Sequence, residues 1–294
     1  MQILICARNA AAHLPRALAA AFAQDYSGEL GVLLVDNGSS DNTAAIAAAA
    51  GARVVSHPVP GVAGARQRAW QEATAPIVAF LDSDCEPPTD WLSRAVPLLL
   101  AEPRRAAVGA RLVDGELCTL AEMHISAQGV LNTDYFWRGS KRHLPFIVTA
   151  AMVARRDALQ AVGGFDETLG RITGEDADLC FRFREAGFSI DYRRDIAVIH
   201  HHRATLRAMM RQIFWYGQGS VAVLARWHHR LSWWARFEVK PPLRLAKALL
   251  LTPVALLFER DPYRRVSPAL RVLDSLAFMA GRWSSAIRHR TFCI

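Results

Sequence analysis

The first 81 residues alternate between short apolar segments and longer alanine-rich segments. We expect strands at 2–6, 30–35, 53–56 and 77–81, and helices at 10–24, 43–50 and 64–73. Strands that are separated by helices of this length pair in parallel, because each crossover returns the chain to the same edge of the sheet. The βαβαβαβ order therefore predicts an α/β fold, in which helices flank a mostly parallel sheet with right-handed crossovers.

Two aspartates follow the last of these apolar segments. Residues 77–81 suit a strand that is buried on both faces, and Asp82, Ser83 and Asp84 come directly after it. Open α/β sheets bind ligands beyond the carboxyl ends of their strands, and side chains two apart in an extended segment point the same way. Both carboxylates can then reach one divalent cation. The pattern indicates a DxD metal site.

The same aspartates have simpler interpretations. An aspartate after a strand often starts a turn or caps a helix, so a DxD pattern alone is a weak signal. Phosphotransferases with an aspartate nucleophile also place DxD after a buried strand, but this chain has Glu86 where such enzymes usually carry threonine. Only other motifs in the chain can separate these alternatives.

Composition limits the class of protein. The chain of 294 residues is 52% hydrophobic and 21% charged, which excludes a disordered protein. Its five cysteines show no CxxC pairing, and it begins on a strand-like segment without the features of a leader peptide. We therefore expect a globular protein in a reducing, cytoplasmic location.

Positive charge is concentrated in the last third of the chain. Residues 1–192 hold 17 Lys and Arg against 22 Asp and Glu, a net of −5, whereas residues 193–294 hold 18 against 5, a net of +13. Several tryptophans share the basic part: Trp215, Trp227, Trp233, Trp234 and Trp283. Basic residues interleaved with tryptophan suit an anionic membrane surface. An ordinary solvated basic surface is the alternative; nucleic acid fits the pattern as well, but we do not expect it as a partner.

Two further positions have the chemistry to contact a nucleotide. Asp36 stands at the carboxyl end of the second strand, where a carboxylate can accept hydrogen bonds from a base or ribose. Arg66 follows glycines at a helix start, where a guanidinium can meet a diphosphate. Taken alone, each is more simply a capped turn or a surface arginine. The GxGxxG and GxxxxGK[ST] fingerprints are absent, which disfavours dinucleotide oxidoreductases and P-loop enzymes.

Six motifs in this order resemble glycosyltransferase family 2, the nucleotide-sugar-dependent transferases of GT-A fold. They are ILICARN (3–9), VDNGSSDNT (35–43), GARQRA (64–69), FLDSDCEP (80–87), GGFDE (163–167) and GEDADLCFRFREAGF (174–188). Six motifs in the family's order are far less expected by chance than any one of them. The resemblance covers residues 1–205, and it implies a Rossmann-like GT-A catalytic domain there, followed by a basic, mainly helical region at 206–294.

The resemblance also implies a donor site. The loop after the first strand lines the nucleoside in this family and usually ends Pro-Thr-Tyr-Asn. Here the matching residues are Cys6, Ala7, Arg8 and Asn9. Asp36 matches the uracil or ribose aspartate, and Arg66 matches a nucleotide-contacting arginine. The DxD segment is Asp82, Ser83 and Asp84, with Asp84 as the more direct ligand of Mn²⁺ or Mg²⁺.

Two more groups complete the implied site. The family's ED pair corresponds to Glu175 and Asp176, with Asp176 as the base that deprotonates the acceptor and Glu175 as an acceptor contact. A simpler interpretation is that these acids cap a helix and favour its dipole. A histidine after the strand at 195–200 completes the metal site in many members; His200 matches it, and His202 on the same side is the alternative.

The resemblance ends near residue 205. We expect a helix pair in the segment RQIFWYGQGSVAVLARWHHR (211–230), and the apolar run 248–258 contains Pro253 and is too short to span a membrane. We expect an amphipathic appendage that rests on the inner face of the cell membrane; a helical lid over the acceptor cleft is the close alternative.

The resemblance thus implies an inverting, metal-dependent glycosyltransferase of glycoconjugate synthesis. We favour a UDP-sugar as donor, and expect a hydroxyl acceptor on a lipid-linked molecule or a polysaccharide. A sugar nucleotidyltransferase is an alternative, although its glycine- and arginine-rich phosphate loop is missing near residue 1. A non-catalytic binding protein of the same fold is the third.

Overall fold

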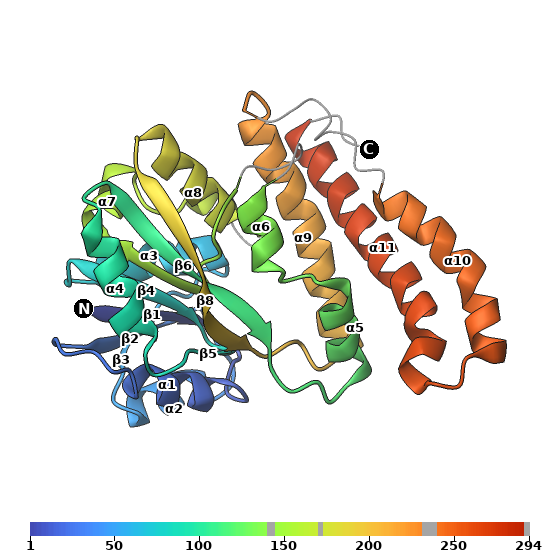
Figure 1. Cartoon of the computed structure of the whole chain (residues 1–294), viewed down its shortest axis with the longest axis horizontal. Helices are drawn as coiled ribbons and strands as arrows, with labels where there is room; N and C mark the ends of the chain where they lie inside the picture. Colours follow the sequence, from blue (N-terminus) through green and yellow to red (C-terminus); the bar gives the residue numbers. More distant parts are fainter. Residues whose placement is uncertain (140–144, 170–172, 231–239, 291–294) are drawn as a thin grey trace.

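The computed structural model describes residues 1–139, 145–169, 173–230 and 240–290. Within them, eight strands form one sheet in the order β3-β2-β1-β4-β7-β6-β8-β5 (Figure 1). The strands are β1 (Gln2–Ala7), β2 (Gly31–Asp36), β3 (Arg53–Ser56), β4 (Ile77–Asp82), β5 (Cys85–Glu86), β6 (Arg105–Asp114), β7 (Ala151–Arg155) and β8 (Ser189–His200). All four strands expected before residue 82 are present, within one residue of the predicted bounds.

Strand direction divides the sheet into two parts. β3, β2, β1 and β4 are parallel, which confirms the expectation from the alternating segments. β7 then runs antiparallel to both β4 and β6, while β8 is parallel to β6 and antiparallel to β5. Because parallel neighbours end at the same edge, the chain segments that leave β1, β2 and β4 lie side by side.

Helices cover both faces of the sheet and continue beyond it. They are α1 (Leu14–Phe22), α2 (Thr43–Ala49), α3 (Val62–Glu72), α4 (Trp91–Ala101), α5 (Leu120–Gln128), α6 (Thr133–Arg138), α7 (Arg156–Ala161), α8 (Glu175–Glu185), α9 (Leu206–Trp227), α10 (Lys240–Phe258) and α11 (Pro262–His289), with a short 3-10 helix at Glu167–Leu169. Pro15 lies in the first turn of α1, where its missing N–H costs no hydrogen bond, so the helix begins there and not at residue 10.

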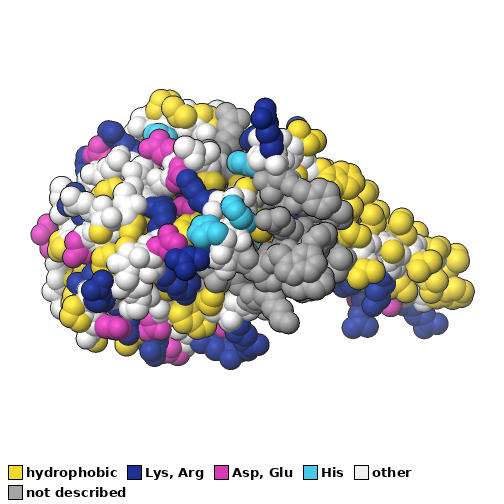
Figure 2. Space-filling view, turned by 90° about the horizontal axis from the view of Figure 1, so that it is seen from above, with side chains coloured by type: hydrophobic (Ala, Val, Ile, Leu, Met, Phe, Trp, Pro, Cys, Tyr) yellow, Lys and Arg dark blue, Asp and Glu magenta, His cyan; other side chains and the backbone are white. Residues whose placement is uncertain are grey.

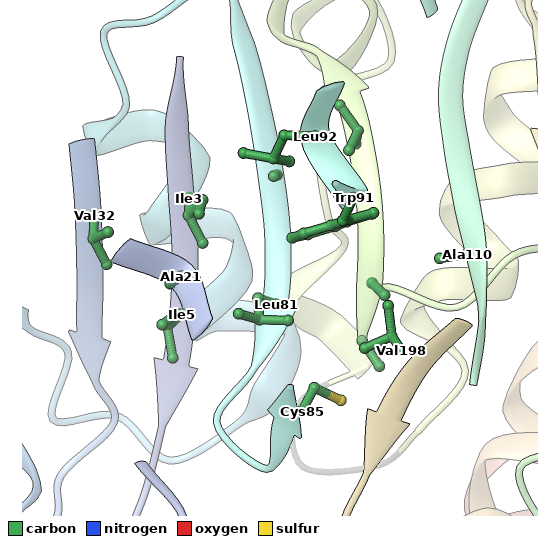
Figure 3. Packing of buried hydrophobic residues seen from close by; sticks show 14 of the residues in the cluster. Ile3, Ile5, Ala21, Val32, Leu81, Cys85, Trp91, Leu92, Ala110 and Val198 are labelled. Carbon is green, nitrogen blue, oxygen red and sulfur yellow. The ribbon is translucent and has the colours of Figure 1, made fainter. Parts of the chain in front are cut away.

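The alternation of side chains along β1 separates two hydrophobic clusters. Ile3 and Ile5 pack with Leu81 and with Trp91 of α4 on one face, as Figure 3 shows. Leu4 faces the opposite cluster, to which α3, α7 and α8 contribute. Burial on both faces explains why these strands are apolar without interruption.

The segment 211–230 does not form the expected helix pair, because α9 is a single helix that runs through Gly217 and Gly219. These glycines are sites of close packing and not breaks. A Cβ at Gly217 would lie 2.2 Å from the carbonyl oxygen of Phe278 in α11, and one at Gly219 would lie 2.1 Å from that of Thr173. Only glycine allows both neighbours to approach so closely.

α10 and α11 lie beyond α9, on its side away from the sheet (Figure 1). α11 lies along α9, and α10 forms a hairpin with α11. Among the described residues, no helix combines the length and the apolar character that crossing a bilayer requires. Trp233 and Trp234 of the basic, tryptophan-containing part lie outside the described residues.

Candidate active site

A buried arginine joins the end of β4 to the start of α8. Arg66, from α3, donates to Asp82 Oδ1 at 2.7 Å and also bonds Glu175 Oε1. Burial disfavours the guanidinium charge, but the two carboxylates outweigh that effect and raise the pKa of Arg66 above its ordinary value. Three of the residues expected in the donor and acceptor sites are therefore brought together, although Arg66 meets carboxylates and is not exposed as a surface arginine.

The DxD segment bends after its first aspartate. Asp82 is the last residue of β4, and Ser83 and Asp84 form the turn into β5, so the extended conformation expected through Asp84 ends at Asp82. The turn arises because β5 pairs in antiparallel fashion with β8, and it directs Asp84 toward the end of that strand. Asp82 and Asp84 consequently have different partners.

Asp84 and His200 face each other. His200 Nε2 lies 3.6 Å from Asp84 Oδ1, and Arg203 lies 3.5 Å from the other carboxylate oxygen. Burial favours the neutral acid, but the basic groups of His200 and Arg203 outweigh it and hold the pKa of Asp84 below its ordinary value. The carboxylate is therefore ionised, as a metal ligand must be. Burial also lowers the pKa of His200, which favours the neutral imidazole.

Potential ligand atoms of Asp84, Cys85 and His200 all lie within 4.8 Å of one another, and this is the one such group among the described residues. Burial raises the pKa of the Cys85 thiol, which leaves the carboxylate and the imidazole as the ready donors. His200 Nδ1 is buried without a hydrogen-bond partner in the described part of the chain. A carboxylate beside an imidazole fits a hard or borderline divalent cation such as Mn²⁺.

His202 is directed elsewhere. Its Nε2 lies 2.7 Å from Asp114 Oδ1 at the end of β6, while its ring centroid is 5.2 Å from that of His200. Since Asp114 already contacts it, His202 is less suited than His200 to face Asp84. Both histidines are buried.

The loops after β1 and β2 are bound to each other. Ala7 is paired with Asp36 in the parallel ladder, so the two residues stand together at the carboxyl ends of β1 and β2. Asn9 adopts a left-handed φ of 51°, and its Oδ1 accepts from the backbone N–H of Ser40 at 2.8 Å. Arg8 is exposed beside it. Ala7, Arg8, Asn9 and Asp36 thus border one part of the edge, next to β4.

Glu175 and Asp176 begin α8, and their acidity is unusual. Burial raises the pKa of Glu175 to about 7, although Arg66 opposes the shift. Its Oε2 is buried without a partner among the described residues. Burial likewise raises the pKa of Asp176, whose Oδ1 accepts from the adjacent backbone N–H of Ala177 at 2.8 Å. Neither acid caps the helix: its N-cap is Gly174.

Asn37, which was not among the predicted site residues, holds the loop before α3 in place. Its Nδ2 donates to the carbonyls of His57 at 3.0 Å and Val59 at 2.7 Å, and its Oδ1 accepts from Gly61 N at 3.0 Å. These bonds fix the loop that leads into α3, and so place Arg66. The NGSSDNT motif contained the residue, but its partners are 20 or more positions away.

α9 supplies one wall of the site. Burial and the nearby charges of Asp84 and Asp176 raise the pKa of the Tyr216 hydroxyl, which accepts from Gln212 Nε2 at 2.9 Å. A buried hydrogen bond also joins α9 to α8, in which Trp227 Nε1 donates to Asp178 at 2.9 Å. The sequence offered this placement only as the alternative of a helical lid over the acceptor cleft.

Comparisons with known proteins show which family the chain is similar to. The family model described as glycosyl transferase family 2 matches residues 2–163. A pre-mycofactocin glycosyltransferase of Mycobacterium tuberculosis is 35% identical over 209 residues, which are 68% of this chain, and this chain spans 43% of that protein. The glycosyltransferase AglE of Haloferax volcanii is 28% identical over 237 residues, 76% of this chain and 73% of its own length.

Solved structures share the fold. A mannosyltransferase from Pyrobaculum calidifontis, solved with GDP-Man and Mn²⁺, aligns over 95% of this chain and 86% of its own, with a TM-score of 0.65 and 20% identity. Glucosyl-3-phosphoglycerate synthase from Mycobacterium tuberculosis, solved with Mn²⁺ and UDP, aligns over 76% of this chain and 78% of its own, with a TM-score of 0.54 and 21% identity. Both confirm the expected GT-A type of α/β fold.

Proposed function

The chain belongs to glycosyltransferase family 2, and we propose that it moves a sugar from a nucleoside-diphosphate sugar to an acceptor hydroxyl, with inversion and with the help of Mn²⁺ or Mg²⁺. The observation that carries this proposal is the facing pair of Asp84 and His200 at the edge where β1, β2 and β4 end. That edge is where open α/β sheets bind ligands.

The donor side of the site is assigned to the loops after β1 and β2. Asp36 would bind the base or ribose, and Ala7, Arg8 and Asn9 would line the nucleoside. We favour a UDP-sugar, because the family resemblance assigns a uracil or ribose contact to Asp36. Two solved structures of the same fold contain GDP-Man or UDP, so titration with UDP and with GDP tests the choice of base.

Asp84 and His200 would hold the cation, and Asp82 and Ser83 would contact the diphosphate or the sugar. When bound, a divalent cation neutralises the negative charge that builds on the diphosphate as the sugar departs. Arg66 keeps Asp82 in place and brings one positive charge close to the same region. These residues provide positioning and charge, which is what departure of a diphosphate requires.

Asp176 is the base that we propose for the acceptor. Its carboxylate has no salt bridge to any described residue, and burial raises its pKa, which makes it a stronger base than an exposed aspartate. Glu175 would contact the acceptor through its unpartnered Oε2. An acceptor oxygen that Asp176 deprotonates attacks the anomeric carbon from the face opposite the departing diphosphate, so one displacement inverts the configuration.

We further propose a division into a catalytic region at 1–205 and a helical region at 206–294. Tyr216 and Trp227 of α9 contact or face the first region, which supports a role for α9 in shaping the acceptor side. The acceptor hydroxyl would belong to a lipid-linked molecule or a polysaccharide. The helical region would bring the enzyme to an anionic membrane surface, at the inner face of the cell membrane.

The metal assignment is tested by Asp84→Ala. We expect the protein to remain folded and to lose most of its Mn²⁺-dependent affinity for UDP, because the variant removes the carboxylate of the proposed ligand pair. Isothermal titration with UDP, with and without Mn²⁺, measures this loss. Asp90→Ala is the matched control, since Asp90 precedes α4 and its side chain makes no cap hydrogen bond. Unchanged Mn²⁺-dependent affinity in folded Asp84→Ala would refute the assignment.

A further inference from the structure

A basic cleft lies between α10 and α11. Its volume is about 300 Å³, and Ala127 at the end of α5 closes one side. Four cationic side chains line it, together with a tyrosine and a serine: Arg244, Lys247, Arg264, Arg271, Tyr263 and Ser267. α10 and α11, whose residues line the cleft, lie on the opposite side of α9 from the sheet (Figure 1).

The four cations have no acidic partner in the described part of the chain. Arg271 Nε is buried there without a hydrogen bond. The acids of the hairpin are engaged elsewhere: Asp274 contacts His124, and Asp261 caps α11 through the backbone of Arg264. Residues 240–290 contain 10 Lys and Arg against 3 Asp and Glu. The cleft is therefore suited to a multiply charged anion such as a phosphate.

An apolar stripe adjoins the cleft on α10. Leu243, Leu250, Val254 and Leu257 repeat at helical spacing, and they are 65%, 75%, 53% and 77% exposed. At about 100° per residue, this stripe lies roughly a quarter of a turn from the face that carries Arg244 and Lys247. Figure 2 shows the same arrangement: hydrophobic side chains dominate the projecting hairpin, and Lys and Arg gather along one of its edges.

We propose that this hairpin is a lipid-binding site, in which the cleft holds the phosphate of an anionic lipid and the stripe enters the acyl region of the bilayer. Charge complementarity selects the phosphate, and the exposed leucines select the lipid over free phosphate. Apolar surface beside a basic face is what interfacial helices use to lie in a membrane. The inference specifies the partner in the membrane proposal above, but the binding itself needs no sugar donor.

Two double variants with equal charge changes test the cleft. Arg244→Gln/Arg264→Gln removes one exposed cation from each helix of the cleft, whereas Arg207→Gln/Arg288→Gln removes two exposed cations outside it. Co-sedimentation with vesicles of phosphatidylcholine and phosphatidylglycerol measures binding. A basic residue close to an anionic surface strengthens binding by a factor of about five, so we expect the first pair to weaken it about 25-fold. The second pair should weaken it less than about 3-fold.

Equal losses of vesicle binding for the two double variants would refute the cleft as a phosphate site, because they would show a diffuse electrostatic effect. Equal binding of the unaltered protein to pure phosphatidylcholine vesicles would overturn it as well. Leu250→Ser/Leu257→Ser tests the stripe separately: it should reduce vesicle binding at least 10-fold. Full competition by equimolar inorganic phosphate would contradict the preference for a lipid.

Two other occupants of the hairpin are outcomes of the same experiments. A dimer in light scattering that Leu250→Ser/Leu257→Ser dissociates would show that the stripe binds a second copy of this chain. Duplex DNA that binds more tightly than the vesicles, with the loss confined to Arg244→Gln/Arg264→Gln, would show a nucleic-acid site. Either outcome would overturn the proposal. UDP affinity in the presence of Mn²⁺ should be unchanged in every variant, which separates this test from that of the sugar-transfer site.

Discussion

Asp178 offers the sharpest test of how α9 is held against α8. Its carboxylate is fully buried on α8, one turn after Glu175. Oδ1 accepts from Trp227 Nε1 at 2.9 Å and from Arg226 at 3.1 Å, and Oδ2 accepts from Arg182 Nε at 2.8 Å. The bonds from Trp227 and Arg226 join α8 to α9, whereas Arg182 lies on α8 itself. We expect Asp178→Asn to break this two-bond connection between the helices.

The loss of stability expected for Asp178→Asn follows from the N–H donors that lose an acceptor. Asparagine keeps the shape, but its NH₂ group must face at least one N–H donor. Removing one partner from a buried ionic network costs about 3–5 kcal/mol. We expect the lower end, about 3 kcal/mol, because Arg182 also donates to Val162 O and Arg226 also bonds Asp166. At roughly 2 °C per kcal/mol for a large domain, Tm should fall by about 6 °C.

Asp195→Asn is the matched control. It makes the same chemical change in a carboxylate that is half-exposed and bonds Arg94 at 2.6 Å and Arg193 at 3.0 Å. Exposed ion pairs contribute about 0–1 kcal/mol, so its Tm should fall by no more than about 2 °C. Scanning calorimetry of both variants in one buffer measures the difference. Similar shifts for the two would refute the idea that Asp178 holds α9 on α8.

Four further outcomes are expected. Asp176→Asn should lower kcat by roughly 10²-fold or more while donor affinity is retained. The kcat of the unaltered enzyme should fall on acidification at a pH above the ordinary aspartate pKa of about 3.9, because burial raises the pKa of a base that acts deprotonated. A flat profile of kcat at moderately acidic pH would contradict this. Gly219→Ala should destabilise the protein by about 1–3 kcal/mol in urea unfolding, since its Cβ would lie 2.1 Å from the Thr173 carbonyl oxygen. Gly31→Ala is the control and should be nearly neutral, because its Cβ would lie 3.6 Å from the nearest atom. The product should have inverted configuration by NMR, and retention would exclude a single displacement.

Local patterns in the sequence determined the first half of the fold. Strands and helices up to residue 82 were predictable because each is encoded by its own short periodicity, and a βαβ order leaves few ways to pair the strands. The edge that gathers Asp36, Asp82 and Asp84 follows from the same rule, because parallel strands end together. The proximity of His200 to Asp84 was predictable only from the family resemblance, since 116 positions separate the two residues.

Tertiary structure decided what each of these side chains meets. The turn at Ser83 exists because β5 pairs with β8, and it gives Asp82 and Asp84 different partners. The same holds for α9, whose glycines look like helix breaks in the sequence but provide room for Thr173 and Phe278. Contacts of this kind join segments that are far apart in the chain, and their energy depends on packing that no local pattern records. The sequence by itself therefore determined the strands, the helices and the types of residue at the site, while only the folded chain decided which charges are paired, which are buried and which leucines are left exposed.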